Sequence, residues 1–233
     1  MKISGLQKMT LLDYPGKVAC TVFLGGCNFR CPFCHNWELL DAGAGQVMDM
    51  GEFLQFLSRR KGLLDAVCVS GGEPTLQQDL PELLREIKAM GYLTKLDTNG
   101  SRPAVLKELV RRGLVDYVAM DIKNSPARYG ETSGTAVKME NIEESIRLLV
   151  SGVVDYELRT TVVAQLHDAK SILEMGQWVA GLAEGKTIKR WFVQPFVDRE
   201  TVHYEGLVAP DADQLSEFVG ILSRFSSHSS LRG

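Results

Sequence analysis

The sequence of 233 residues lacks both a long apolar run and an excess of basic residues. A bilayer-spanning helix needs roughly 18 apolar residues and a secretory signal needs an apolar centre, and residues 1–17 contain neither. We therefore expect a cytoplasmic protein that has no membrane partner. Lysine and arginine number 26 against 29 aspartates and glutamates, a net charge of -3. Because this balance provides no broad basic field, we expect no nucleic-acid partner.

Cysteine is also scarce, with five residues of which three lie close together. An odd number clustered in this way favours metal binding in a reducing compartment over a disulfide framework. The other two, Cys20 and Cys68, lie within apolar strand patterns, so we expect them in the core. Composition, with 45% hydrophobic residues, favours one globular domain. We predict a single domain over residues 1–233, with an N-terminal extension at 1–16, the main body at 17–225 and a flexible tail at 226–233.

Short segments rich in β-branched residues alternate along the chain with amphipathic segments. The strands are predicted at residues 17–24, 65–70, 92–98, 115–123, 155–163 and 188–194. The helices are predicted at residues 50–60, 80–90, 103–112, 138–150, 169–182 and 211–225. This alternation predicts an α/β protein with a parallel sheet, either open and doubly wound or a partial barrel. Both architectures place functional residues at the carboxyl ends of the strands.

Four segments lie outside this alternation of strands and helices, and we predict an extended piece for one and loops for the other three. Residues 2–9 read as an extended piece that flanks the sheet. The polar or glycine-rich stretches 41–49, 124–134 and 197–209 are candidate lids or partner-binding loops.

Three cysteines, Cys27, Cys31 and Cys34, follow the first predicted strand at a CxxxCxxC spacing. Structural zinc sites and electron-transfer iron-sulfur clusters usually have four protein ligands, so three thiolates indicate a metal with an open coordination position. The alternative is zinc completed by His35 or by a distant ligand. Zinc sites usually combine two CxxC-like pairs, and the sequence has no second pair, so the open iron-sulfur site is favoured.

The second predicted strand ends in Gly71-Gly72-Glu73-Pro74. Glycines at this point let the backbone approach a ligand closely, although the same four residues also suit a turn into a helix. The tetrapeptide alone is weak evidence for a ligand-binding site. It becomes stronger evidence because it follows the cysteines by one βα unit.

Carboxylates end the third and fourth predicted strands, in Asp97-Thr98 and Met120-Asp121. Neighbouring strands lie about 5 Å apart, so Asp97 and Asp121 would repel each other unless a cation lies between them or one carboxylate is protonated. A bound monovalent or divalent cation is one solution. Lys123 lies on the same side as Asp121 and offers another, by neutralising the pair.

Arg159 lies in the middle of the fifth predicted strand. A buried arginine is rare unless it is paired, so an anionic group should face it. The candidates are Glu157 on the same face of the strand and an anionic ligand.

The cysteine spacing, with Phe33 before the third cysteine, resembles the signature of the radical S-adenosylmethionine (SAM) superfamily. The resemblance implies that Cys27, Cys31 and Cys34 hold one 4Fe-4S cluster whose fourth iron binds SAM. It implies that the reduced cluster cleaves SAM to methionine and a 5′-deoxyadenosyl radical. Gly71 to Pro74 resemble the GGEP motif that contacts the SAM amino group, and His35 is a further candidate that shields the cluster or packs against adenine.

Two more motifs resemble those of glycyl-radical-enzyme activating enzymes, the group that includes pyruvate formate-lyase activating enzymes. Residues 97–100 resemble their DTNG motif and residues 121–123 their DLK motif. This implies a cation site formed by Asp97, Thr98, Met120 and Asp121, and SAM contacts from Lys123 and Arg159. Residues 13–16, Asp-Tyr-Pro-Gly, resemble the branch of activating proteins for anaerobic ribonucleoside-triphosphate reductase.

The resemblance implies a partial (β/α)6 TIM-like barrel and a protein substrate, a glycyl radical enzyme that loses one glycine Cα hydrogen. With no second cluster in the sequence, the electron would come from a flavodoxin or ferredoxin. Arg128, Tyr129 and residues 197–209 are candidate rim contacts, and His167, His203 and His228 are expected at the surface. Two alternatives stay open: a radical SAM enzyme that acts on a small molecule, and a non-catalytic zinc module.

Overall fold

The computed structural model describes residues 2–41 and 45–232, and the chain divides into two compact units. The first unit comprises Met1–Asn28, Glu38–Thr98 and Ala104–Val118. The second comprises Phe29–Trp37, Asn99–Pro103 and Ala119–Gly233. The centre of the predicted loop at 41–49 lies outside the described residues. Within them, no helix is both long and apolar enough to cross a lipid bilayer.

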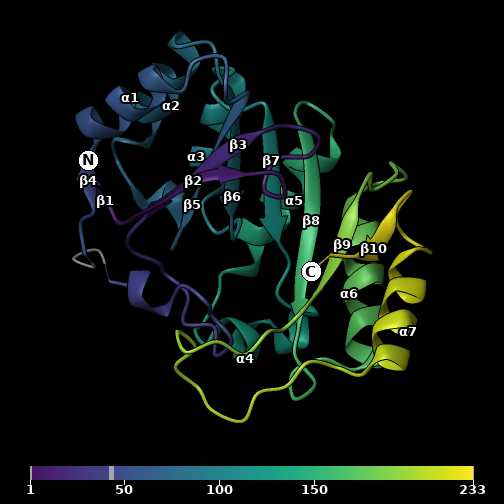
Figure 1. Ribbon diagram of the computed structural model, residues 1–233. Helices are drawn as coiled ribbons and strands as arrows, with labels where there is room; N and C mark the ends of the chain where they lie inside the picture. The colour runs from purple at the N-terminus through teal and green to yellow at the C-terminus, as the bar shows by residue number, and fades with distance from the viewer. Residues whose placement is uncertain (1, 42–44, 233) are drawn as a thin grey trace. The chain divides into compact units, whose positions relative to one another are not determined.

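The first unit alternates strands and helices as predicted (Figure 1). Its strands are β1 (Lys2–Ile3), β2 (Gly5–Thr10), β3 (Ala19–Leu24), β4 (Met48–Asp49), β5 (Ala66–Gly71) and β6 (Leu93–Thr98). Its helices are α1 (Met50–Arg59), α2 (Leu80–Ala89) and most of α3 (Pro103–Arg111), with the short 3-10 helices η1 (Trp37–Leu39) and η2 (Pro74–Leu76). Strands β3, β5 and β6 are parallel in that order. The predicted flanking piece is confirmed, since β2 pairs antiparallel with β3.

Local sequence explains how these elements begin and what they bury. The Asp49 side chain accepts from the N–H of Glu52 while the Glu52 carboxylate accepts from the N–H of Asp49, a reciprocal cap that starts α1. Cys20 and Cys68 are fully buried on the paired strands β3 and β5, so the prediction that they are core cysteines is confirmed. Burial raises the pKa of the Cys20 thiol to about 12.

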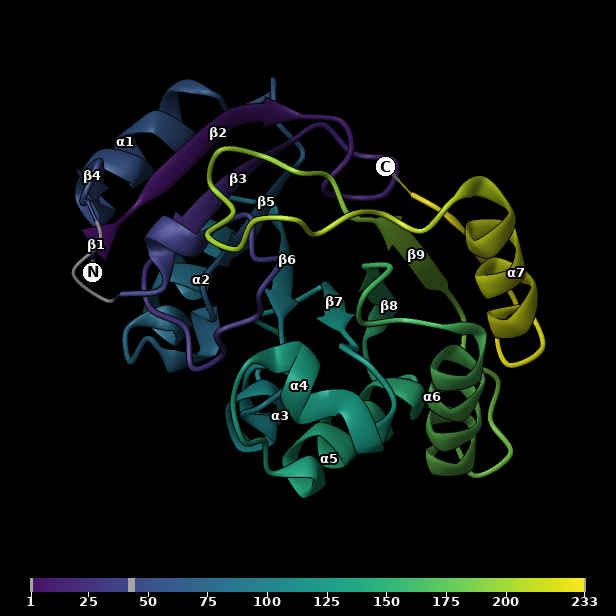
Figure 2. The same cartoon turned by 90° about the horizontal axis from the view of Figure 1, so that it is seen from below.

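The second unit continues the alternation. Its strands are the last residues of β7 (Tyr117–Asp121), then β8 (Asp155–Val162), β9 (Trp191–Pro195) and β10 (Ser229–Leu231). Its helices are α4 (Tyr129–Ser133), α5 (Met139–Val150), α6 (Ala169–Leu182) and α7 (Ala212–Leu222), with the 3-10 helix η3 (Pro126–Arg128). Strands β8, β9 and β10 are parallel, and α6 and α7 lie side by side (Figure 2). Residues 197–209 run without helix or strand, as predicted for a loop.

Two predictions about this unit were wrong. The tail at 226–233 was expected to be flexible, but β10 pairs with β9 and Arg232 forms an ion pair with buried Glu157. The segment 124–134 was expected to be a loop, but η3 and α4 occupy it. In both cases tertiary contacts order a stretch whose small or polar composition indicates no regular structure.

Candidate functional site

The cysteine triplet lies on the connection that follows β3, with Cys27 in the first unit and Cys31 and Cys34 in the second. None of the five cysteines, all of which the structure describes, forms a disulfide. Cys31 is buried, and the N–H of Cys34 donates to its carbonyl oxygen at 3.1 Å. Burial raises the pKa of the Cys31 thiol, while the positive charge of Lys123 opposes this rise. Binding to a metal ion would supply the positive charge that a buried thiolate needs.

Within the second unit, α4 supports this loop. The N–H of Arg30 donates to Ser133 O at 2.8 Å. Gly134 ends α4 at φ 67°, and a Cβ at this position would overlap the carbonyl oxygen of Arg30. A glycine is therefore needed here both for its positive φ and for the close approach of two backbones.

His35 and Trp37 connect the same loop to the segment after β9. His35 donates through Nε2 to Val197 O at 2.6 Å and stacks on Phe196. The Trp37 ring stacks on His203 at a centroid distance of 4.7 Å. His35 thus contacts residues 196–197 of its own chain, a role that the sequence did not indicate.

The glycine motif at the end of β5 packs against the chain that leads to the cysteines. A Cβ on Gly71 would overlap Leu24 O, and one on Gly72 would overlap Gly26 O. The N–H groups of Gly72 and Glu73 donate to the same two carbonyl oxygens, at 2.9 and 2.8 Å. Both glycines are thus required by packing within the first unit, in addition to any contact with a ligand.

Glu73 is fully buried, and its carboxylate serves the protein itself. Its Oε1 accepts from the N–H of Thr75 at 3.1 Å, from the Thr75 hydroxyl at 2.5 Å and from the Thr98 hydroxyl at 2.8 Å. Pro74 begins η2. Glu73 therefore joins the end of β5 to the end of β6, where the predicted site residue Thr98 lies.

Asp97, the other predicted site residue on β6, pairs with Lys95. The Lys95 side chain is only 1% exposed, so this is a buried charge with a carboxylate beside it. Sequence reasoning missed Lys95, although a lysine inside an apolar strand pattern is a usable signal.

Asp121, Lys123 and Arg159 form a charge cluster in the second unit. The Arg159 Nε donates to Asp121 Oδ1 at 2.9 Å, and the Lys123 ammonium donates to Asp121 Oδ2 at 3.1 Å. An anionic group was predicted to face Arg159, and in the structure that group is Asp121, which was not among the candidates. The alternative partner, Glu157, binds Arg232 instead. Burial alone would lower the pKa of Lys123, but the negative charge of Asp121 outweighs it and raises that pKa.

Other predicted residues of the second unit lie near this cluster. The Lys123 ammonium lies 5.9 Å from the centre of the buried Phe33 ring. Met120 is fully buried, and its side chain fills the space where Gly100 has no Cβ. Lys123 thus lies near Phe33 of the cysteine loop, and the Asp121 carboxylate joins Lys123 to Arg159.

Buried polar groups that the sequence did not reveal support the cluster. His167 was expected at the surface, but it is 2% exposed. It accepts at Nδ1 from the N–H of Val163 at 3.1 Å and donates from Nε2 to Lys123 O at 2.8 Å. Tyr129 was expected at the rim, but it is fully buried. The expectation holds for His203 and His228, which are exposed.

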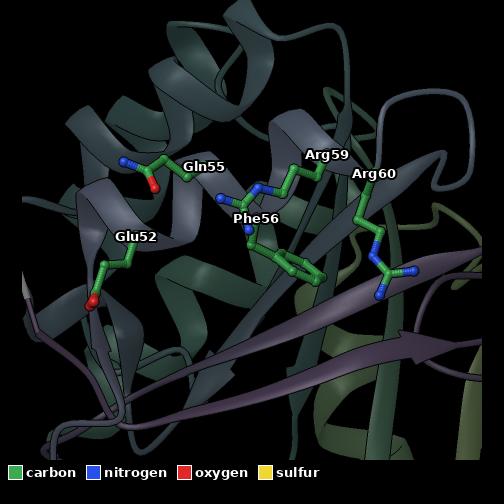
Figure 3. A pocket seen from close by; sticks show the side chains of 5 residues that line it. All are labelled: Glu52, Gln55, Phe56, Arg59 and Arg60. Atoms are coloured by element: carbon green, nitrogen blue, oxygen red, sulfur yellow. The ribbon is translucent and has the colours of Figure 1, made fainter.

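One pocket lies apart from these residues, on α1. Figure 3 shows its lining, the side chains of Glu52, Gln55, Phe56, Arg59 and Arg60. Arg60 covers the Phe56 ring at 5.4 Å from its centre. None of the predicted site residues is among these five.

Comparison with known proteins identifies the family. The profile of the radical SAM superfamily matches residues 21–164. A protein of Methanocaldococcus jannaschii with the provisional name glycyl-radical enzyme activating enzyme is 32% identical over 96% of this chain and 92% of its own length. The pyruvate formate-lyase-activating enzyme of Clostridium pasteurianum is 34% identical, over 53% of this chain and 52% of its own length.

A solved structure has a similar fold. A domain of the pyruvate-formate lyase-activating enzyme from Bacteroides vulgatus superposes with a TM-score of 0.59 at 18% identity, over 72% of this chain and 99% of that domain. The chain belongs to the radical SAM superfamily, and its fold is the α/β, partial (β/α)6 TIM-like barrel type that was predicted. Within the superfamily it is an enzyme of the type represented by glycyl-radical enzyme activating enzymes.

Membership implies a 4Fe-4S cluster and SAM, and the donor groups present suit both. Thiolates are the ligands of such clusters, and Cys31 is a buried thiol with a cation nearby. Lys123 and Arg159 are cationic groups suited to a carboxylate such as that of SAM. Among the described residues, no three His, Cys, Asp or Glu side chains converge on a point where they could hold a metal ion. The cluster assignment therefore rests on the spacing, the thiol chemistry and the family.

Proposed function

We propose that this chain uses one 4Fe-4S cluster, held by Cys27, Cys31 and Cys34, to activate a glycyl radical enzyme. When bound, the reduced cluster and SAM supply methionine and a 5′-deoxyadenosyl radical, which takes a hydrogen atom from a glycine Cα of the partner and becomes 5′-deoxyadenosine. The observation that carries the proposal is the buried thiol of Cys31 near the Lys123 ammonium, which shares the Asp121 carboxylate with Arg159.

The protein groups have separate tasks in this proposal. Lys123 and Arg159 bind and orient the carboxylate of SAM, and Asp121 holds both cations in place because each of its oxygens accepts from one of them. The backbone at Gly71, Gly72 and Pro74 provides the surface for the SAM amino group, while buried Glu73 keeps this turn joined to β6. Phe33 and His35 cover the cysteine loop and limit access of water.

The predicted cation site at Asp97, Thr98, Met120 and Asp121 stays a proposal. Asp97 and Asp121 both have cationic partners already, in Lys95, Lys123 and Arg159. A bound cation would therefore have to compete with lysine and arginine for these carboxylates.

The partner proposed is an anaerobic ribonucleoside-triphosphate reductase, because Asp13-Tyr14-Pro15-Gly16 matches that branch of activating proteins. The electron donor proposed is a flavodoxin or ferredoxin, since the sequence has one cysteine triplet and no second. The Methanocaldococcus relative is named for activating a glycyl-radical enzyme, and the Clostridium relative for activating pyruvate formate-lyase. Both names denote an enzyme that acts on another protein, which supports a protein substrate for this chain.

Anaerobic reconstitution tests the proposal in stages. The protein is loaded with iron and sulfide, and iron is counted for the wild type and for alanine variants of Cys27, Cys31 and Cys34. Cys20→Ala is the matched control, because Cys20 is buried in β3. The triplet variants should lose the cluster and the control should keep it. Bound zinc without iron in the wild type would refute the cluster.

SAM and a reductant are then added with a panel of glycyl radical enzymes. We expect 5′-deoxyadenosine together with a glycyl doublet in the electron paramagnetic resonance spectrum for one partner. If 5′-deoxyadenosine forms and no partner ever shows the doublet, the activating function is wrong while SAM cleavage stands. In that case the alternative of a small-molecule substrate gains support.

A further inference from the structure

Two buried side chains of the second unit join the connection after β7 to the connection after β8. His167 is 2% exposed and Asn124 is 0% exposed. His167, after β8, donates from Nε2 to Lys123 O at 2.8 Å. Asn124, after β7, donates from Nδ2 to Leu166 O at 2.7 Å. Each connection thus contributes one side chain that binds the backbone of the other, and we call this pair of hydrogen bonds the clamp.

The backbone on both sides of the His167 ring fixes its tautomer. The N–H of Val163 lies 3.1 Å from Nδ1 and can only donate, so Nδ1 accepts and carries no proton. The proton is therefore on Nε2, which donates it to Lys123 O. Burial lowers the pKa of His167 and so favours this neutral form. The ring thus spans from Val163, directly after β8, to Lys123.

Asn124 has partners at both ends of its amide. Its Oδ1 accepts from the N–H of Ser125 at 2.8 Å, and its Nδ2 also donates to the Thr132 hydroxyl at 2.9 Å. Thr132 belongs to α4, whose Ser133 O accepts from the N–H of Arg30. Asn124 therefore connects the clamp to the helix that supports the cysteine loop.

Lys123 depends on the clamp because it lies beyond the end of its strand. Strand β7 ends at Asp121, and the N–H of Ile122 donates to Arg159 O on β8 at 2.8 Å. The backbone of Lys123 is then held at its carbonyl oxygen by His167. An ammonium has three donors, so that of Lys123 can bind Asp121 and a ligand carboxylate at the same time. A shift of the Lys123 backbone would move this ammonium relative to Arg159.

We propose that His167 and Asn124 are positioning residues that hold Lys123 where its ammonium meets the carboxylate of SAM. This inference rests on the proposed SAM site. Neither side chain touches the ligand, and both act on its affinity through the backbone of Lys123. Groups that orient metal ligands change metal affinity by roughly 10–100-fold when they are lost, and by analogy we expect about tenfold for SAM.

Two amide side chains at position 167 separate positioning from stability. Asparagine places its amide oxygen near the site of Nδ1, so His167→Asn keeps an acceptor for Val163 and loses the donor to Lys123. Glutamine reaches the site of Nε2, so His167→Gln keeps that donor and loses the acceptor. Each variant loses one buried hydrogen bond, so both should be destabilised to a similar extent. His228→Asn is the matched control, because His228 is exposed directly before β10.

The wild type and the three variants are reconstituted anaerobically, and iron is counted first. The dissociation constant of SAM is then measured by titration calorimetry, followed by KM and kcat for 5′-deoxyadenosine formation with a chemical reductant. In His167→Asn we expect about tenfold weaker SAM binding and a higher KM at a nearly unchanged kcat. His167→Gln should keep most of the affinity, and the control all of it. Wild-type affinity in His167→Asn, or equal losses in the two amide variants, would overturn the proposal.

Decarboxylated SAM tests which part of the ligand is involved. It lacks the group that Lys123 binds in this proposal, so His167→Asn and the wild type should have the same affinity for it. A loss as large as that for SAM would overturn the proposal.

Asn124→Ser tests the other half of the clamp and decides the question if His167→Asn does not fold. It should also bind SAM more weakly, and wild-type affinity with a full cluster would overturn the proposal. If the wild type takes up no iron or binds no SAM, the proposed function is wrong. Wild-type binding of both, with no change in the variants, would contradict only the role of the clamp.

Discussion

Arg232, which directly precedes the last residue of the sequence, should contribute strongly to stability. Its guanidinium makes two hydrogen bonds with the Glu157 carboxylate, at 2.5 and 3.0 Å. It lies 3.5 Å from the centre of the Phe192 ring, and its backbone N–H donates to Val193 O at 2.9 Å. The perturbation that tests this anchor is Arg232→Met, which keeps most of the side-chain length and removes the charge.

The size of the effect follows from the burial of the pair. Glu157 is 0% exposed, whereas the Arg232 side chain is 31% exposed. Removal of one partner of a buried ion pair costs about 3–5 kcal/mol, because a charge stays buried without its counter-charge. We expect the lower end, about 3 kcal/mol, since Arg232 is partly solvated and β10 can separate from β9 and admit water to Glu157. For a chain of this size that corresponds to a melting temperature lower by roughly 6–12 °C.

Thermal unfolding of the cluster-free protein, followed by circular dichroism, measures this loss. Arg111→Met is the control, because its partner Glu108 belongs to a pair at the protein surface. The double variant with Arg232→Met and Glu157→Gln should recover part of the lost stability, since the buried charge is gone. If Arg232→Met melts together with the Arg111→Met control, the anchoring role of the C-terminal segment is refuted.

Two further predictions concern the loop support and its pH dependence. Gly134→Ala should lower iron uptake strongly, because the added Cβ would overlap Arg30 O. The control Gly113→Ala should keep normal iron uptake, because Gly113 has a similar φ of 64° but no atom near its Cβ position. Equal iron uptake in the two variants would contradict the role of α4. Burial lowers the pKa of His167 from 6.5, so below this pH the unfolded chain binds more protons than the folded protein. The urea concentration at the midpoint of unfolding should therefore fall as the pH drops below about 6.5. His167→Gln should lose this part of the pH dependence, and an unchanged slope in the variant would contradict it.

The local pattern of apolar and polar residues predicted most of the helices and strands of this protein. The predicted helix at 169–182 coincides with α6, and the predicted strand at 155–163 differs from β8 by one residue. Periodicity works here because each element has one face to bury. The cysteine spacing and the GGEP motif indicated the family because both are short patterns that can be read directly from the sequence.

Local composition gave wrong predictions for two segments whose structure is stabilised by contacts with residues far away in the sequence. The tail that contains β10 is short and polar, and nothing local shows that its arginine meets a buried glutamate far back in the chain. The segment at 124–134 is rich in turn-forming residues, yet α4 forms there and packs on Arg30. Weak local propensity was overridden in both cases by partners that the sequence cannot place.

The sequence by itself determined that three cysteines follow a strand end at a CxxxCxxC spacing, because residue type and spacing are properties of the chain. Only the tertiary structure decided which charges meet in the second unit. Arg159 binds Asp121 rather than Glu157, His167 is buried against the carbonyl of Lys123, and the Tyr129 hydroxyl is buried without a partner among the described residues. The physical reason is that such pairings depend on which side chains from distant strands and helices share a dry interior, and burial sets their cost.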